Sequence, residues 1–167
     1  MVDLEQFREN ARLDGLCDEY TEIWDSCKSK KQLMDMCLGI KGIDYICDAI
    51  AKGWGISPSI LSEKFKNYIN GNYTFDNGVY TTKLYCSYDG TVVCDTTAVA
   101  IIDSNVVVEV PTNCLVEIYL TGDTNVFFRG NGRCAIVVYG DKVNFSVDEE
   151  TNVRYKVIYK KEKDSYN

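Results

Sequence analysis

The chain of 167 residues contains no histidine and no pair of cysteines separated by two residues. Histidine is the commonest general base in enzymes, and histidines and paired cysteines are the usual ligands of protein-bound zinc. Their absence removes the usual catalytic triads and the usual zinc spacings. We therefore expect a protein that is not an enzyme and that has no catalytic residue, no metal site and no cofactor.

The sequence also lacks any run of about eighteen apolar residues, the length that a membrane-spanning helix needs. Its first residues, MVDLEQFREN, are polar and acidic and do not contain the apolar core of a signal peptide. We therefore expect a soluble protein that has no membrane contact and is not secreted by a signal peptide.

Three segments could still carry chemistry, and each has a simpler interpretation. Cys94 follows a predicted strand and has no candidate base beside it, so we expect a buried strand cysteine. The acids of residues 148–150 could serve a glycosidase, but a run of acids in a turn is usually solvated. Residues 130–133, Gly-Asn-Gly-Arg, lack the lysine and hydroxyl residue of a phosphate-binding loop and are predicted to form a turn.

The eight cysteines are a large number for a chain without an export signal, and we expect their thiols to be reduced. The first four recur every ten residues, at Cys17, Cys27, Cys37 and Cys47. On the predicted helices each of them joins an apolar face. We therefore predict that they pack in the core.

Residues 1–71 are predicted to form a helical module of four short helices packed as a small bundle. Apolar residues recur there at steps of three and four, as at Ile43, Ile46, Cys47 and Ile50. Polar caps and glycines mark the expected starts and ends of the helices. These signals are Asp3 with Gln6, Ser29 with Gln32, Gly53, Ser57 with Pro58, and Gly71.

Residues 72–160 are predicted to form a β-rich domain, and residues 161–167 a charged tail, which makes the fold class α+β. The apolar period changes to two after Gly71, and the apolar segments recur at intervals of roughly ten residues. Asp89-Gly90 and Asn131-Gly132 suit hairpin turns and so favour an antiparallel sandwich. The spacing fits a short β-solenoid equally well, and the two architectures remain open at this point.

The segment 49–71 can be interpreted as a helix-turn-helix or as a packed helical corner that leads into the β-rich domain. Ile50-Ala51, residues 55–59 and Leu61-Ser62 with Phe65-Lys66 resemble one helix-turn-helix of the AraC-type transcription regulators. The resemblance implies that Leu61 and Phe65 pack inside and that four polar residues face DNA. These four are Ser59, Ser62, Lys64 and Lys66.

Charge is spread unevenly along the chain. The formal net charge is −7, but residues 28–71 contain seven lysines and four acids, a local charge of +3. The rest of the chain therefore carries −10. A basic helical segment between acidic flanks is compatible with a nucleic-acid contact, and a solvated lysine face explains it equally well.

A longer resemblance runs through most of the chain. The order of Trp24, SKKQLMDMCL, GWGISP, FKNYING, YTTKLYCSYDG, IYL and VVYG is similar to small uncharacterised proteins of tailed phages and prophages from gut bacteria. The resemblance implies a helical head followed by a β-rich part. It also implies a viral accessory role in the host cytoplasm or incorporation into the virion.

These observations predict a non-enzymatic interaction protein that binds a phage or host protein, or a second copy of itself, through its β-rich domain. Aromatic residues make up 12% of the chain, and tyrosines on strands can mark a binding surface. The candidates are Tyr119, Tyr139, Tyr155 and Tyr159. Two alternatives remain, a helix-turn-helix regulator that binds nucleic acid and an inhibitor of a host defence system.

Overall fold

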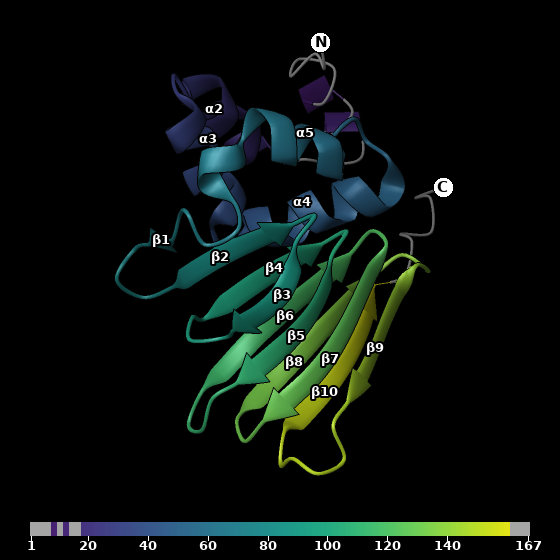
Figure 1. Cartoon of the computed structure of the whole chain (residues 1–167). Coiled ribbons are helices and arrows are strands. Elements are labelled where there is room, and N and C mark those ends of the chain that lie inside the picture. Colours follow the sequence, from purple (N-terminus) through teal and green to yellow (C-terminus); the bar gives the residue numbers. More distant parts are fainter. Residues whose placement is uncertain (1–7, 10–11, 14–17, 161–167) are drawn as a thin grey trace.

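The computed structural model describes residues 8–9, 12–13 and 18–160. Helical elements come first and strands follow (Figure 1), which confirms the predicted α+β class. The helices are α2 (Asp18–Ser26), α3 (Lys30–Leu38), α4 (Ile40–Lys52), α5 (Pro58–Lys64) and the 3₁₀ helix η1 (Lys66–Tyr68). The strands are β1 (Phe75–Asp76), β2 (Thr81–Cys86), β3 (Asp89–Val93), β4 (Ala98–Ile102), β5 (Asn105–Val110), β6 (Leu115–Thr121), β7 (Thr124–Gly130), β8 (Arg133–Tyr139), β9 (Val143–Val147) and β10 (Arg154–Lys160).

From β2 onward the strands alternate between two sheets and form a solenoid-like coil. Sheet A has the order β1-β2-β4-β6-β8-β10, and sheet B has the order β3-β5-β7-β9. Apart from the short antiparallel pair β1–β2, every strand pair is parallel. Each coil of the chain therefore adds one strand to sheet A and the next strand to sheet B.

Of the two predicted architectures, this topology agrees with the solenoid and not with the antiparallel sandwich, and both predicted hairpins are wrong. The residues on either side of each predicted turn go to opposite sheets: β2 lies in sheet A and β3 in sheet B, and β7 lies in sheet B and β8 in sheet A. The reason is the apolar character of the sheet A strands on both of their faces. All five residues of β4 are buried, a pattern typical of parallel sheets that are covered on both sides.

The space between the two sheets is filled by the inward-facing row of each strand. Val92, Val108 and Phe128 come from sheet B and meet Ile101 and Ile118 of sheet A, and all five are fully buried. The row repeats from coil to coil because the parallel register keeps equivalent positions side by side. This core is continuous along the coil, as in other stacked-repeat proteins.

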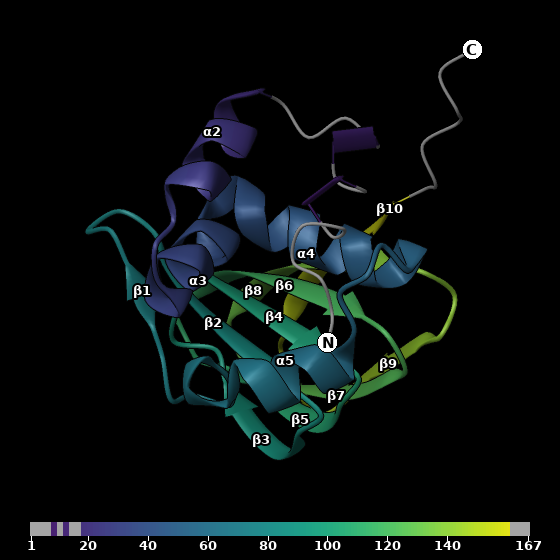
Figure 2. The same cartoon turned by 90° about the horizontal axis from the view of Figure 1, so that it is seen from above.

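The helices form a layer on the outer face of sheet A. Figure 2 shows α4 crossing over β4, β6 and β8, and these elements are in contact. Two buried threonines fix the layer to the sheet: Thr82 donates a hydrogen bond to the carbonyl of Leu38 (2.8 Å), and Thr121 donates one to the carbonyl of Cys47 (3.2 Å). The apolar faces of the helices thus share one core with sheet A, so the predicted small bundle with a core of its own is wrong.

Most predicted caps of the described helices are confirmed. The Ser29 hydroxyl accepts the backbone N–H of Gln32 (3.2 Å), and the Ser57 hydroxyl accepts that of Ile60 (3.3 Å). Gly53 ends α4 in the left-handed conformation (φ 71°), which glycine adopts without a steric cost. The last helix is shorter than predicted, because α5 ends at Lys64 and η1 follows well before residue 71. The predicted cap at Asp3 and Gln6 lies outside the described residues.

The cysteines pack largely as predicted. Cys37 and Cys47 are buried, and Cys27 is half-buried. Cys17 lies outside the described residues. The seven cysteines that the structure describes are free thiols.

Candidate interaction surfaces

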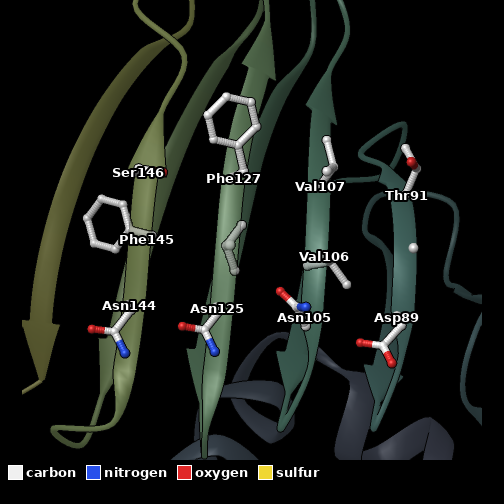
Figure 3. A pocket seen from close by; sticks show the side chains of 12 residues that line it. Asp89, Thr91, Asn105, Val106, Val107, Asn125, Phe127, Asn144, Phe145 and Ser146 are labelled. Carbon is white, nitrogen blue, oxygen red and sulfur yellow. The ribbon is translucent and has the colours of Figure 1, made fainter.

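The outer face of sheet B is the broad strand surface that no other described element covers. Side chains on it lie in rows across four strands because the parallel register places equivalent positions side by side. Asp89, Asn105, Asn125 and Asn144 form one row, which we call the asparagine row, and all four are exposed. Figure 3 shows this row crossing the strands at one level, with Thr91, Val107, Phe127 and Ser146 in the next. Neighbouring strands are about 4.8 Å apart, so each row is a closely spaced ladder.

The centre of this face is uncharged and its border carries charge. Phe127, with 40% of its surface exposed, lies on β7 between Asn125 and Arg129. Arg129 is paired with Glu109 of the neighbouring strand, and its Nε donates to the Glu109 carboxylate at 2.9 Å. Asp89 lies at the opposite corner of the face. Within the described part of the chain, the side-chain amides of Asn105 and Asn125 have no hydrogen-bond partner, so they are free to bind a ligand.

The first two rows line a shallow groove of about 760 Å³. Residues of all four sheet B strands contribute to it, from Asp89 on β3 to Ser146 on β9. A groove of this width and shallowness, with amides at one side and Phe127 in the middle, suits a broad surface contact more than the enclosure of a small molecule.

The asparagine row is visible in the sequence as a repeated segment, which the predicted strands and turns do not include as a repeat. The segments beginning at Asp89, Asn105, Asn125 and Asn144 read DGTVV, NVVVE, NVFFR and NFSVD. Each begins with an acid or an amide and then alternates outward and inward positions. Asn105 and Asn125 are the first exposed residues of β5 and β7.

A second uncovered surface lies at the end of the coil, at strand β10. Tyr155, Val157 and Tyr159 pair with Cys134, Ile136 and Val138 of β8, which are core residues between the sheets. The inward row of β10 is thus a continuation of the core. Val157 is half-buried against this core, whereas Tyr155 and Tyr159 remain 50% and 65% exposed. We call these three residues, together with the free edge of β10, the open end.

The four predicted tyrosines therefore fall into two groups. Tyr119 and Tyr139 lie on the outer face of sheet A beneath the helices and are buried. The Tyr119 hydroxyl donates to Glu117, and that of Tyr139 donates to Asp44. Burial raises the pKa of Tyr139 far above its ordinary value, and neighbouring Cys47 and Asp44 add to the effect. The structure leaves only Tyr155 and Tyr159 accessible to a partner.

The structure separates the four residues of the predicted DNA-binding helix. Ser59, Lys64 and Lys66 are exposed, whereas Ser62 is half-buried and its hydroxyl faces the Cys86 sulfur on β2 (3.6 Å). Leu61 and Phe65 are buried, in keeping with the predicted inner face. α5 has seven residues and packs on β2. DNA binding through this helix stays a prediction.

The segments with candidate catalytic residues lie in the core or in turns of the fold. Cys94 is fully buried directly after β3, and burial raises the pKa of its thiol to about 12. Asp148 accepts the backbone N–H of Glu150 (3.0 Å) and so shapes the turn after β9. Asn131 and Gly132 form the corner between β7 and β8, where both of their N–H groups bond to the Val110 carbonyl (3.1 and 3.0 Å).

We expect iodoacetamide to distinguish the buried thiols from the accessible ones. Only the thiolate reacts, and with a pKa near 12 almost all of Cys94 is protonated at pH 8. The partly exposed Cys114 should therefore be modified while Cys94 stays intact in the folded protein. Peptide mass mapping at pH 8 measures both sites, and raising the pH should speed the reaction at Cys94 as its thiolate fraction grows. Equal rates at the two sites at pH 8 would contradict the burial.

Among the described residues, no group of three or more acidic or cysteine side chains is arranged to hold a metal ion. The helices in the same part of the chain are too short or too polar to cross a membrane.

No protein-family model, curated protein or solved structure matches this chain.

Proposed function

We propose that the protein is a non-enzymatic interaction protein that binds a protein partner through the outer face of sheet B. The observation that carries this proposal is the uneven covering of the two sheets. The inner faces pack on each other, and the helices cover the outer face of sheet A. The outer face of sheet B keeps its amides and Phe127 in water across all four of its strands.

The make-up of this face supports a protein partner. Protein interfaces are depleted of charge at their centre, contain aromatic residues there and have a polar rim. Phe127, Val107 and the three asparagines of the row are uncharged. Asp89 and the Glu109–Arg129 pair lie toward the border. The free amides of Asn105 and Asn125 can bind backbone groups of a partner, and Phe127 supplies the apolar anchor.

The biological setting belongs to the same proposal. The order of sequence segments that resembles small phage and prophage proteins supports an accessory or virion-associated role, with a phage or host protein as the partner. A defence protein of the host is one such partner. We therefore expect the partner among proteins that are present during phage growth.

Site-specific photocrosslinking tests the proposal. A photoreactive phenylalanine analogue at position 127 should give a discrete crosslinked product in phage-producing cells, because Phe127 lies at the centre of the face. The same analogue at position 79, which is 88% exposed in the turn before β2, is the matched control and should give none.

A second substitution then tests whether the crosslinked product forms at the outer face of sheet B. Adding Asn125→Lys to the crosslinking variant should abolish the product, because it places an unpaired charge at the uncharged centre. The proposal fails if position 79 gives the same product, or if Asn125→Lys leaves the product unchanged. A product with twice the mass of the chain would identify a second copy as the partner.

A further inference from the structure

The two edge strands of sheet A differ in how their outward backbone groups are hydrogen-bonded. At the first end, β1 pairs with β2 through Phe75 and Asp76. Asn70 continues this cover, because its N–H donates to the Leu84 carbonyl (2.9 Å) and its side-chain oxygen accepts the N–H of Cys86 (3.0 Å). The hydrogen-bonding edge of β2 is thereby satisfied. Exposed edges pair with other chains, and proteins commonly cover them in this way.

At the other end, β10 has a regular hydrogen-bonding edge that no described element uses. Arg154 donates its N–H to the Gly132 carbonyl on the β8 side (3.0 Å). Successive residues of a strand direct their backbone groups to opposite sides. The N–H and C=O groups of Tyr155, Val157 and Tyr159 therefore point away from β8. No described element pairs with them.

The side chains beside this edge form two contrasting rows. The inner row consists of Tyr155, Val157 and Tyr159 and continues the core, with Val157 half-buried against it and both tyrosines exposed. The outer row is basic, with Arg154, Lys156 and Lys160 around Ile158, and all four are exposed. Lys160 pairs with Asp44 (3.2 Å), whereas Arg154 and Lys156 have no ion pair within the described residues.

We propose that the open end binds an extended, acidic segment of a partner protein, which adds to β10 as the next strand of sheet A. Such strand addition obtains its affinity from main-chain hydrogen bonds and its specificity from alternate side chains. Valine-like residues of the segment cover Tyr155, Val157 and Tyr159. Its acids lie opposite Arg154, Lys156 and Lys160, where opposite charges on neighbouring strands stabilise the pairing.

The same charges disfavour a second copy of this chain as the occupant. Antiparallel pairing of two β10 strands about Val157 would place Arg154 of one copy directly opposite Lys160 of the other. Like charges at directly opposite positions destabilise a sheet. Basic residues on an edge strand are also a common protection against pairing with identical edges. The edge therefore discriminates by charge, accepting acidic strands and rejecting its own copy.

Fluorescence polarisation with the full chain tests the proposal. The probe is the labelled peptide Glu-Val-Asp-Val-Thr-Val-Glu, which alternates acids with valines in the required register. We expect saturable binding of this peptide. A peptide with lysines in place of its acids, and a scrambled peptide with contiguous acids, should both bind at least about tenfold more weakly.

Variants of the protein test whether the peptide binds at the open end. Lys156→Glu replaces an attraction by a repulsion and should weaken the acidic peptide about tenfold, while improving the lysine peptide. Val157→Pro removes one outward N–H without removing a bond to β8, and should also weaken binding about tenfold. Lys66→Glu, an exposed lysine on η1, is the matched control and should leave the affinity unchanged.

The charge swap makes the outcome independent of folding defects, because a misfolded Lys156→Glu variant could not gain affinity for the lysine peptide. Absence of binding by the original chain, or equal loss in Lys156→Glu and Lys66→Glu, would overturn the proposal. So would sedimentation showing a dimer that Lys156→Glu dissociates, since the edge would then accept its own copy. The outer face of sheet B is remote from these changes, so the photocrosslink at position 127 should persist in Lys156→Glu.

Discussion

Replacing Phe128 with alanine is expected to lower the free energy of unfolding by about 3–5 kcal/mol. Phe128 is fully buried between the two sheets, and its ring meets that of Phe145 edge to face at 6.0 Å. Removing it leaves a cavity in a core that repeats rigidly from coil to coil, so the neighbouring rows cannot collapse into the space. Urea unfolding followed by circular dichroism measures the loss.

Phe127 provides the matched control for this prediction. It is the preceding residue on β7, but it points to the outer face of sheet B and is 40% exposed. Phe127→Ala should therefore cost less than about 1 kcal/mol. If the two alanine variants lost equal stability, the assignment of inner and outer faces would be wrong. The pair also separates stability from function, because Phe127 is the proposed anchor of the partner and Phe128 is not.

Gly132→Ala is expected to destabilise the protein by about 3 kcal/mol, because two successive coils touch at this corner. A Cβ at position 132 would lie 2.2 Å from the Pro111 carbonyl oxygen and 2.7 Å from a methyl group of Val110. The first contact is with backbone, which cannot move aside without separating the coils. Thermal unfolding with a two-state fit measures the loss.

Gly78→Ala is the control for the corner variant. Gly78 has a positive φ of 81°, but a Cβ there would meet nothing within 4 Å. Its substitution should cost only the backbone strain of about 1–2 kcal/mol. A loss at Gly132 no larger than that at Gly78 would show that the coils do not stack as closely as the structure places them.

The local signals in the sequence predicted most of the helix caps in the helical half. Ser29, Gly53 and Ser57 cap helices as predicted because capping depends on backbone groups within a few residues. The burial of Cys37 and Cys47 also follows from local periodicity. What these signals could not supply was the partner of each apolar face. The predicted bundle was wrong because the faces pack on sheet A, whose strands come later in the chain.

The strand half shows a similar division. The apolar segment 126–128 predicts a strand, and β7 contains it but is longer, at residues 124–130. The pairing of β7 depends on β5 and β9, which lie in neighbouring coils, and turn residues carry no information about that choice. Asn131-Gly132 was predicted to join a hairpin because its residue types suit a tight turn. The same residues serve a corner between sheets, since a corner also needs a close approach of backbone.

The candidate surfaces were predictable only in part. Tyr119 and Tyr155 are both strand tyrosines in the sequence, and nothing local distinguishes them. Tyr119 is buried because α4 crosses the sheet above it, whereas Tyr155 is exposed on β10, the last strand of sheet A. The asparagine row is visible as a repeat in the sequence, but its exposure depends on the helices covering sheet A and leaving sheet B open.

The sequence by itself determined the order of helices and strands, the helix caps at Ser29, Gly53 and Ser57, and the alternation that gives the strands an inner and an outer row. These properties follow from interactions within a few residues of one another. The tertiary structure alone decided the parallel coil, the helical layer on sheet A, the exposed row from Asp89 to Asn144 and the open end at β10. Each of these depends on contacts between residues that are distant in the chain, and local periodicity does not specify which distant faces meet.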